Sequence, residues 1–493
     1  MMAMIVYAAL AILMANLVFG VFLWFKVRKL YCYPGVLGFP VIGNLYNAYK
    51  TLLMITVDRG VKYGVAVAEE HGKDGIFFHW LCGSNVAAVI TSPHLVKKLS
   101  FHPNLADKSY AIYNAFKICM DGPFSDICSD DEWKQKRKDY NINLKKSRVD
   151  SDYFNTFIKR SDKMVEKMLA SSSSHVDAHA ICSSVVYDIS LKTMFGIDSD
   201  LVYHPDLVRV YDRIKVILAT VVSDIPMIHV IQPILHRIID VSIGKLVELR
   251  KLGLAEIDNK LKSNEGPLQD LTLFMYMALK HKKDNGSERI LFNKIHELFL
   301  TSGHTVASVL SNMTYFLAVL PDIQERAWQE QYEIFGNDVR DPTIADLNQM
   351  KYLSRFMKES LRFVGPSVVV KSATADITID GITIPRGTQV VFLLRYIKFD
   401  PKYFKNPNIF DPDRFLDESD VLKCGQSSFG AGIRNCPGEY FATILLKIVL
   451  SKMLRSLKLK TVDKNFRFED MKYKSYILGD VENPPKLQVE KRT

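Results

Sequence analysis

The stretch of sequence that says most about this chain runs from Phe429 to Ala442 and reads FGAGIRNCPGEYFA. Its three glycines permit tight backbone conformations and the close approach of a flat ligand. Pro437 stands where a helix can begin, because its missing N–H is no loss in a first helical turn. Cys436 then precedes a helix N-terminus, whose N–H groups favour a thiolate over a thiol. Such a thiolate is a ligand for a soft metal or a haem iron, although a single cysteine is more often a buried structural residue.

The spacing within this stretch favours the ligand interpretation. Phe429, Gly432, Arg434, Cys436 and Gly438 follow the pattern Phe-x-x-Gly-x-Arg-x-Cys-x-Gly, which resembles the haem-binding loop of the cytochrome P-450 monooxygenases. The resemblance implies that Cys436 is the axial thiolate ligand of the iron. It also implies that Arg434 pairs with a haem propionate and that Phe429 packs beside the sulfur.

Two upstream segments follow the same family in the same order. Glu359 and Arg362 in KESLRF stand at i,i+3 and share one helix face, a spacing that by itself usually marks a surface ion pair. Arg414 in FDPDRF resembles the family's Pro-x-Arg-Phe segment. The resemblance implies a Glu359–Arg362–Arg414 network that supports the cysteine loop and does no chemistry.

A third segment, EWKQKRK, places Trp133 and Arg137 at i,i+4. The resemblance makes both residues propionate partners, because an indole N–H and a guanidinium are good donors to carboxylates. Lys371 stands where many family members place another propionate-binding arginine, and a lysine donates without the bidentate fork. Three lysines of the same segment are expected on its outer side, as a solvated face or as a docking surface for an acidic flavoprotein: Lys134, Lys136 and Lys138.

A polar stretch, LTSGHTVAS from Leu300 to Ser308, interrupts an apolar helical segment. The family usually carries Ala-Gly-x-(Asp/Glu)-Thr-Thr here and uses the acid and the threonine to deliver protons. In an ungapped alignment Thr305 takes the threonine position and His304 the acidic one. A one-residue gap would rotate everything downstream by ~100°, so we prefer the ungapped register.

The ungapped register predicts that four polar residues share one stripe of the helix: Thr301, His304, Thr305 and Ser308. We therefore expect Thr305 and His304 to deliver protons. Histidine can relay protons near neutral pH, but His304 could instead ligate the iron or pack in the core. No glutamate stands near Thr301 to form the haem ester found in one branch of the family, so we expect non-covalent haem b.

The remaining pattern is mainly helical with a minor β portion, as in the cytochrome P-450 fold. Short alternating strands with turn residues occur within Ala375–Leu394. Pro321 ends the longest helical segment. The segments with clear helical periodicity are Phe154–Leu169, Asp206–Val222, Ile290–Leu320, Ile323–Ile334, Lys351–Val364 and Pro437–Leu457.

Composition indicates a globular chain in a reducing compartment. Of 493 residues 48% are hydrophobic and 24% charged, which suits a large packed core. Seven dispersed cysteines without a Cys-x-x-Cys pair do not form a disulfide framework. The net charge of +10 suits a membrane surface or an acidic partner, whereas a nucleic-acid binder usually concentrates its charge more.

The N-terminus predicts a membrane anchor. Residues 5–25 carry no charge and are long enough to span a hydrocarbon core of ~30 Å. A cleaved signal peptide fits less well, because no basic residue precedes the run. Lys26, Arg28 and Lys29 follow it and place the rest of the chain on the cytoplasmic side. We expect an anchor at 1–29, a Pro/Gly hinge at 30–49 and a catalytic domain at 50–493, in the endoplasmic reticulum membrane.

The resemblance implies a monooxygenase that inserts one atom of O2 into an apolar fatty acid, sterol or xenobiotic. Electrons would come from NADPH through a flavoprotein reductase or a small haem protein. Several segments look most like the animal microsomal branch with fatty-acid ω-hydroxylases and some sterol hydroxylases. A reductase-independent isomerase or dehydratase and a non-catalytic haem or lipid carrier are the alternatives. The expected pocket residues are Phe299, Thr301, Val368, Val369 and Ile477, the last within Tyr476–Leu478.

Overall fold

The computed structural model describes residues 57–82, 85–110, 122–171, 175–196, 297–417, 428–475 and 478–492, with a few positions outside these ranges. The predicted anchor at 5–25 and the hinge at 30–49 lie almost entirely outside the described residues. The helical segment expected at 206–222 and the pocket residue Ile477 also lie outside them.

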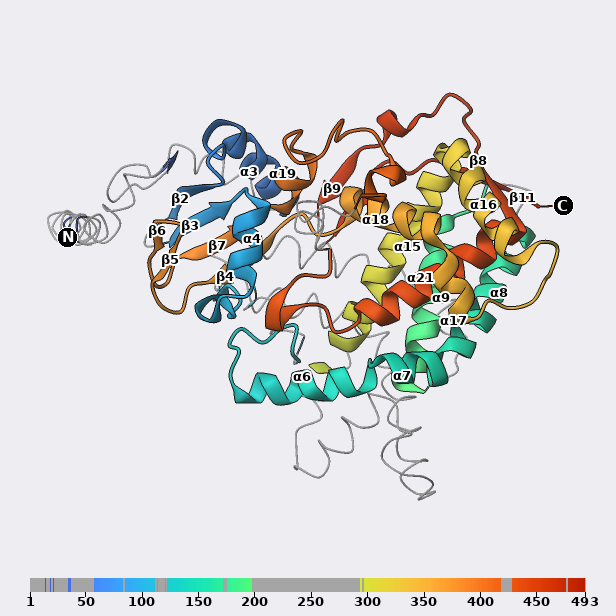
Figure 1. The fold of residues 1–493 in the computed structure, drawn as a ribbon, viewed down its shortest axis with the longest axis horizontal. Coiled ribbons are helices and arrows are strands. Elements are labelled where there is room, and N and C mark those ends of the chain that lie inside the picture. The colour runs from blue at the N-terminus through green and yellow to red at the C-terminus, as the bar shows by residue number, and fades with distance from the viewer. Residues whose placement is uncertain are drawn as a thin grey trace, which may run out of the picture.

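The main sheet and the pair β5 and β6 lie at one end of the molecule, and the pair β8 and β11 lies at the other, near the C-terminus (Figure 1). Its main sheet has the strand order β1-β2-β3-β7-β4. β2 and β3 are antiparallel with Ile76 opposite Ile90, β3 and β7 are parallel, and β7 pairs antiparallel with β4. The strands of this sheet are β1 Gly35–Val36, β2 Ile76–Cys82, β3 Asn85–Ile90, β4 Val369–Ser372 and β7 Gln389–Phe392. Three two-stranded pairs join β5 Ile377–Ile379 to β6 Ile382–Ile384, β8 Leu457–Thr461 to β11 Leu487–Lys491, and β9 Tyr473–Ser475 to β10 Gly479–Val481.

Apolar side chains on the inner faces explain why these strands form. Ile377 of β5 and Ile384 of β6 lie directly opposite each other and are buried. The next pair along the two strands, Thr378 and Thr383, is exposed. This alternation is the period-two pattern that the sequence showed between Ala375 and Leu394. Helices α3 Val57–His71, α4 Pro93–Ser100 and α19 Leu394–Phe399 lie beside the main sheet (Figure 1).

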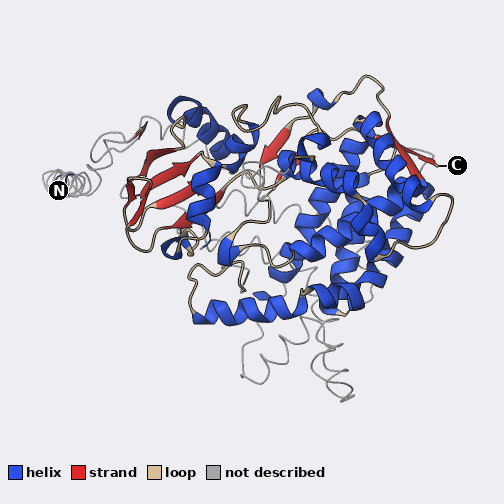
Figure 2. Ribbon diagram, in the orientation of Figure 1, coloured by secondary structure: helices blue, strands red, loops and turns tan. Residues whose placement is uncertain are grey.

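Helices joined by loops make up the rest of the described chain, so the prediction of a mainly α fold with a minor β portion is confirmed (Figure 2). Ring contacts fix several of them, such as Phe157 of α8 edge-on to Phe441 of α21, with ring centroids 4.9 Å apart. The helices are α6 Asp131–Asn143, α8 Phe154–Ala170, α9 Ala178–Ser190, α15 Thr305–Val319, α16 Pro321–Phe335, α17 Ile344–Gln349, α18 Lys351–Val364 and α21 Glu439–Ser456.

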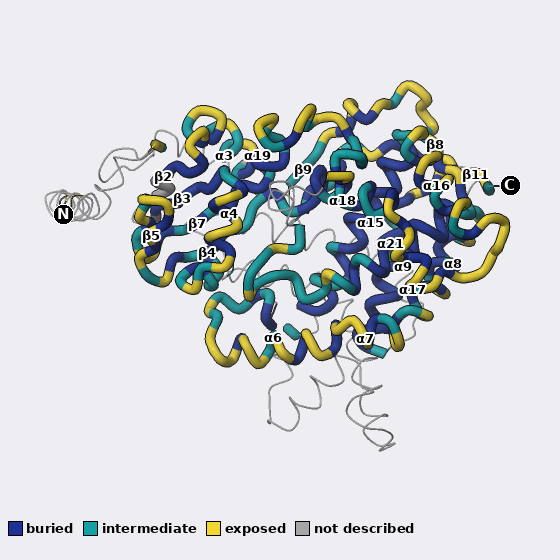
Figure 3. The backbone as a smooth tube through the Cα atoms, in the orientation of Figure 1, coloured by how far each residue is buried: buried dark blue, intermediate teal, exposed yellow. Residues whose placement is uncertain are grey.

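The long central helix contains an irregular turn that the sequence did not predict. A π-helical turn, Leu300–His304, leads directly into α15. At Pro321 the chain bends by 106° between the central helix, Glu297–Val319, and α16. Every residue of α15 from Val306 to Ala318 is buried, which places this helix in the centre of the core (Figure 3). The central helix therefore reaches the site as part of the packed interior.

Among the described residues, no single helix combines the length and apolar composition needed to cross a membrane. The bent pair Glu297–Val319 and Pro321–Phe335 meets the criterion only when its two helices are taken together.

The Glu359–Arg362–Arg414 network is present and buried. Arg362 donates from Nε and Nη2 to the two Glu359 oxygens at 2.9 and 2.8 Å, and Arg414 Nε donates to Glu359 Oε1 at 3.0 Å. Glu359 also accepts from the N–H of Asp411, and Arg362 donates to the carbonyl of Lys398. The network thus ties α18 to the segment around Pro412–Phe415, which precedes the cysteine loop.

Candidate active site

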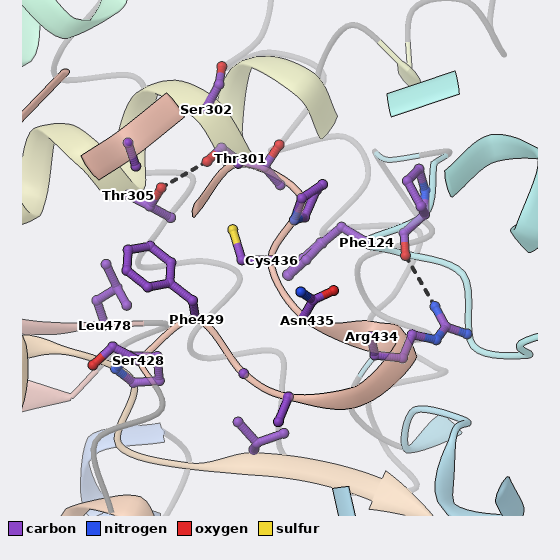
Figure 4. Close-up of a pocket in the computed structure, with 18 of the residues that line it drawn as sticks. Phe124, Thr301, Ser302, Thr305, Ser428, Phe429, Arg434, Asn435, Cys436 and Leu478 are labelled. Atoms are coloured by element: carbon purple, nitrogen blue, oxygen red, sulfur yellow. Dashed lines mark hydrogen bonds between the residues drawn. The ribbon is translucent and has the colours of Figure 1, made fainter. Parts of the chain in front are cut away.

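A cavity of about 410 Å³ lies between the cysteine loop and the central helix. Cys436 and Phe429 form one wall, and Thr301 and Thr305 form the opposite wall (Figure 4). The sulfur of Cys436 points toward the helix that carries the two threonines. Most other lining residues are aliphatic or aromatic, so the cavity suits a flat apolar group held between the two walls.

The cysteine loop is shaped by its backbone. The N–H of Cys436 donates to the carbonyl of Phe429 at 2.7 Å, which closes the loop. Gly430 and Gly432 have φ of 75° and 72°, a left-handed region that favours glycine. A Cβ on Gly432 would also lie 2.2 Å from the carbonyl oxygen of Ser100, so only glycine fits where the loop crosses α4.

Cys436 is half-buried and lies three residues before the start of α21. Burial raises its pKa, and the N–H of Gly438 and the guanidinium of Arg137 oppose that increase. The thiol is therefore expected to carry its proton until a metal takes the sulfur. A haem iron bound here would displace that proton, because metal ligation requires the thiolate.

Four positively charged side chains line this cavity. The four that line it are Lys108, Arg137, Lys371 and Arg434, and no Asp, Glu or His side chain is among the described lining residues. Burial, followed by the neighbouring Arg434, lowers the pKa of Lys371 to about 8 and that of Lys108 to about 7. A flat ligand with two carboxylates would relieve this excess of positive charge, so the residues present fit haem.

Lys108 was missed by sequence reasoning. Its segment, ADKSY, looks like an ordinary polar loop, yet its ammonium lies 4.1 Å from the ring centroids of both Tyr113 and Phe124. The pairing of Lys108 with Lys371 at the edge of the sheet brings it to the cavity. Only this long-range pairing reveals its place.

Arg137, Lys371 and Arg434 all line the cavity, whereas Trp133 does not. Arg137 donates from Nη2 to Asn435 Oδ1 at 2.7 Å. Arg434 stacks 4.1 Å from the ring centroid of Trp133 and donates to carbonyl groups between Pro123 and Cys128. The Trp133 Nε1–H donates to the carbonyl of Pro123 at 3.1 Å. This geometry differs from the expected propionate pairing, because backbone carbonyls already satisfy these donors.

The polar stripe of the central helix differs from the predicted one. Thr301, Ser302 and Thr305 line the cavity, whereas His304 and Ser308 do not. Ser308 instead donates to Asp480 on β10, and His304 is buried. A π-helical turn holds one residue more than an α-helical turn, so it rotates the side chains that follow relative to an unbroken helix. The assumption of a regular α-helix was therefore wrong, and the structure gives His304 no place on the cavity wall.

Of the expected pocket residues, some line the cavity and one does not. Thr301, Val368 and Val369 line the cavity. Phe299 does not: it stacks on Tyr187 with ring centroids 5.0 Å apart and an interplanar angle of 6°. Its place is therefore in the core between the central helix and α9. Leu478, from the expected segment Tyr476–Leu478, also lines the cavity. Residues of the wall that the sequence did not single out include Tyr113, Phe124, Val309 and Phe392.

The outer face of α6 is less basic than expected. Lys134 pairs with Asp131 at 2.8 Å, and Lys136 pairs with Asp126 and with Glu132, both at 3.0 Å. Lys138 is exposed. Most of the positive charge on this face is thus neutralised within the chain.

Comparison with known proteins agrees with this site. The family model described as cytochrome P450 matches residues 35–488. The chain is 39% identical to cytochrome P450 4c21 of Blattella germanica over 207 residues, which cover 41% of this chain and 40% of that protein. It is 34% identical to cytochrome P450 4c3 of Drosophila melanogaster over 38% of this chain and 35% of that protein. A longer match, 24% identical, covers 86% of this chain and 84% of cytochrome P450 3A16 of Mus musculus.

The mainly helical fold with a minor β portion agrees with this family. The chain belongs to the cytochrome P450 family of monooxygenases.

Proposed function

We propose that this chain is a membrane-anchored monooxygenase of the endoplasmic reticulum that inserts one oxygen atom into a C–H bond of an apolar substrate. Two electrons would come from NADPH through a flavoprotein reductase. The observation that carries the proposal is a cavity with a half-buried cysteine on one wall and a threonine on the other. Haem bound through Cys436 would supply the O2 chemistry, because a thiolate ligand favours O–O cleavage.

The substrate would be held by apolar contact. Val309, Val368, Val369, Phe392 and Leu478 line the cavity, and burial of apolar surface contributes about 25 cal/mol per Å². A fatty acid, a sterol or an apolar xenobiotic has the matching chemistry. The sequence segments that resemble the animal microsomal branch with fatty-acid ω-hydroxylases and sterol hydroxylases make fatty acids and sterols the first substrates to test.

Thr305 is the residue proposed to handle protons. Its Oγ1 donates to the carbonyl of Thr301 at 2.8 Å, and the oxygen still has acceptor capacity toward the cavity. It can therefore accept a hydrogen bond from a water molecule in the cavity. Ser302 Oγ and Thr301 Oγ1 make the same kind of bond to the preceding turn, to Leu298 and Glu297.

Only membership of the cytochrome P450 family supports the reductase as a partner. Ion pairing within α6 leaves only part of the expected basic face to attract an acidic partner. The anchor proposal rests on the uncharged run at 5–25 and the basic residues after it.

Reconstitution with the reductase tests the proposal directly. The purified protein, NADPH and O2 are incubated with a panel of fatty acids, sterols and apolar xenobiotics, and oxygen uptake and hydroxylated products are measured. Products that require both reductase and O2 support the proposal. Haem retention without any turnover on the panel would contradict it and favour a non-catalytic carrier.

A second candidate function is a reductase-independent isomerase or dehydratase of lipid hydroperoxides. The absence of Asp, Glu and His among the described lining residues favours it, because such reactions need no delivery of external protons. Conversion of a fatty-acid hydroperoxide without NADPH, together with no oxygen uptake in the reconstituted system, would establish this candidate and exclude the first.

A further inference from the structure

The hairpin formed by β9 and β10 brings one apolar residue to the cavity wall. Leu478 lines the cavity just before β10 begins, and only one residue separates it from Asp480 of that strand. In Figure 4, Leu478 and Thr305 lie on one side of Cys436, and Arg434 lies on the other. The hairpin therefore meets the cavity at its apolar part, and a shift of Asp480 would move Leu478.

Asp480 ties the hairpin to the central helix. Its carboxylate accepts from Ser308 Oγ and from Asn312 Nδ2, the latter at 3.2 Å. Ser308 and Asn312 are four residues apart in α15, so they share one face of that helix. Each is only 2% exposed, so water has little access to these two donors. The contact gives a structural partner to Ser308, the end of the polar stripe predicted from the sequence.

Asn312 also bonds to the backbone on both sides of Asp480. Its Oδ1 accepts from the N–H of Val481 at 3.0 Å, and its Nδ2 lies 3.4 Å from the carbonyl oxygen of Gly479. A Cβ on Gly479 would be 3.1 Å from Val364 Cα, so the strand packs directly on the end of α18. The position of β10 against the two helices is thus fixed.

The other strand of the hairpin is held by different partners. Ser475 of β9 donates its N–H to Asp58 Oδ1 of α3 at 2.8 Å, and its hydroxyl is hydrogen-bonded to that of Ser367 at 3.0 Å. Ser367 stands between Pro366 and Val368, which both line the cavity. Both strands of the hairpin are therefore held by polar contacts close to the cavity.

The contact between Asp480 and Ser308 lies behind the cavity wall. Neither residue lines the cavity, but Val309 follows Ser308 directly and Thr305 precedes it by three residues. Val309, Thr305 and Leu478 all line the cavity. The spacing between Leu478 and the wall formed by the central helix therefore depends on a carboxylate that no substrate touches.

We propose that Asp480 is a positioning residue that sets the spacing between Leu478 and the central helix, and thereby determines how tightly the cavity holds an extended apolar chain. The proposal rests on the haem binding and the apolar substrate of the proposed function. It assigns two roles to the polar residues of the central helix. Thr305 faces the cavity, whereas Ser308 and Asn312 hold Leu478 in place through Asp480.

Binding of two imidazoles to the full-length, haem-loaded protein tests the proposal. Both ligate the iron through the same kind of ring nitrogen, but only N-octylimidazole adds a chain that must pack on the cavity wall, whereas N-methylimidazole lacks one. The dissociation constants are measured from the shift of the haem absorption band in the wild type, Asp480→Ala, Leu478→Ala and the double variant. The ratio of the two constants reports the hold on the chain, because changes in iron ligation affect both ligands.

Asp480→Ala and Leu478→Ala are each expected to weaken binding of the octyl compound relative to the methyl compound by about threefold or more, because each removes the packing of Leu478 on the chain. Since Asp480 acts through Leu478, adding Asp480→Ala to Leu478→Ala is expected to change the ratio by less than about 1.5-fold. Glu482→Gln is the matched control. It breaks an exposed pair with Lys474 on the same hairpin and is expected to leave the ratio within about 1.5-fold of the wild type.

Three results would overturn the proposal: an unchanged ratio in Asp480→Ala, an equal loss of affinity for both imidazoles, or a full effect of Asp480→Ala when Leu478 is already alanine. If Asp480→Ala does not fold, Ser308→Ala removes one donor to the same carboxylate and is expected to move the ratio in the same direction. A wild-type protein that takes up no haem shows no imidazole shift, and the proposed function then fails together with this inference. A normal shift with an unchanged ratio overturns this inference alone.

Discussion

Thr305 and His304 are neighbours in sequence but have different surroundings. Thr305 lines the cavity opposite Cys436, and His304 is buried away from the cavity wall. A proton donor must lie within hydrogen-bond reach of the reacting group, directly or through one water, whatever its pKa. Position therefore favours Thr305, although histidine has the pKa more suited to proton transfer at neutral pH.

Replacement of Thr305 by alanine should uncouple the reaction. With the hydroxyl lost, product formed per NADPH is expected to fall by about 10²-fold, the lower end of what a positioned proton-transfer group contributes. The measurement compares product formed with NADPH consumed in the reconstituted system. Ser311→Ala is the matched control, because Ser311 makes the same bond to the preceding turn, to Ala307 at 2.8 Å, and does not line the cavity. Equal coupling in both variants would show that Thr305 does not deliver protons in this reaction.

Haem uptake should depend on pH through Cys436. Burial raises the pKa of this thiol above its ordinary value, and ligation needs the thiolate, so uptake releases a proton. Below that pKa, the ratio of haem affinities of wild type and Cys436→Ala is expected to rise by about tenfold per pH unit. The ratio cancels the titration of Lys108 and Lys371, which both proteins share. A ratio independent of pH would show that the sulfur does not bind the iron.

At the scale of single elements, the π-helical turn decides which side chains of the central helix reach the cavity. Gly303 lies within this turn and packs on the buried ring of Tyr187 in α9. A Cβ there would be 2.5 Å from Tyr187 Cδ1, and the stacking of that ring on Phe299 prevents it from moving away. The contact between the two helices therefore supports the unusual turn.

Gly303→Ala should destabilise the protein. Overpacking against the ring is expected to cost about 1–3 kcal/mol of the free energy of unfolding, measured with a chemical denaturant. Gly60→Ala is the control within α3, because a Cβ at Gly60 would meet nothing within 4 Å. That change is expected to stabilise the protein by about 0.5–1 kcal/mol, because alanine restricts the unfolded chain. A Gly303→Ala variant as stable as the Gly60→Ala variant would contradict the packing argument.

The network around Glu359 should matter for stability far more than an exposed ion pair does. Arg362→Leu removes a buried partner and leaves the Glu359 carboxylate short of donors, which costs about 3–5 kcal/mol for pairs of this kind. Lys460→Met breaks an exposed pair with Glu490 and is expected to cost about 0–1 kcal/mol. Denaturant unfolding compares the two variants. Similar losses would show that the network does not hold the segment before the cysteine loop.

At the scale of the whole molecule, the sequence predicted features carried by local spacing. The cysteine loop, the pair Glu359 and Arg362, and the mainly helical class could be read directly, because each depends on residues close together in the chain. The π-helical turn could not, since it depends on the distant Tyr187. The partners of Arg434 and the place of Lys108 on the cavity wall were missed for the same reason: residues 122–129 and the edge of the sheet come to the cavity from elsewhere in the chain.

Cys436 is proposed above as the thiolate ligand of a haem held in this cavity. The most direct measurement is the absorption spectrum of the reduced protein with carbon monoxide, compared with that of Cys436→Ala. The expected result is the long-wavelength Soret band typical of a thiolate-ligated haem in the wild type and its loss in the variant. A wild-type band typical of histidine-ligated haem, unchanged in Cys436→Ala, would show that Cys436 does not ligate the iron.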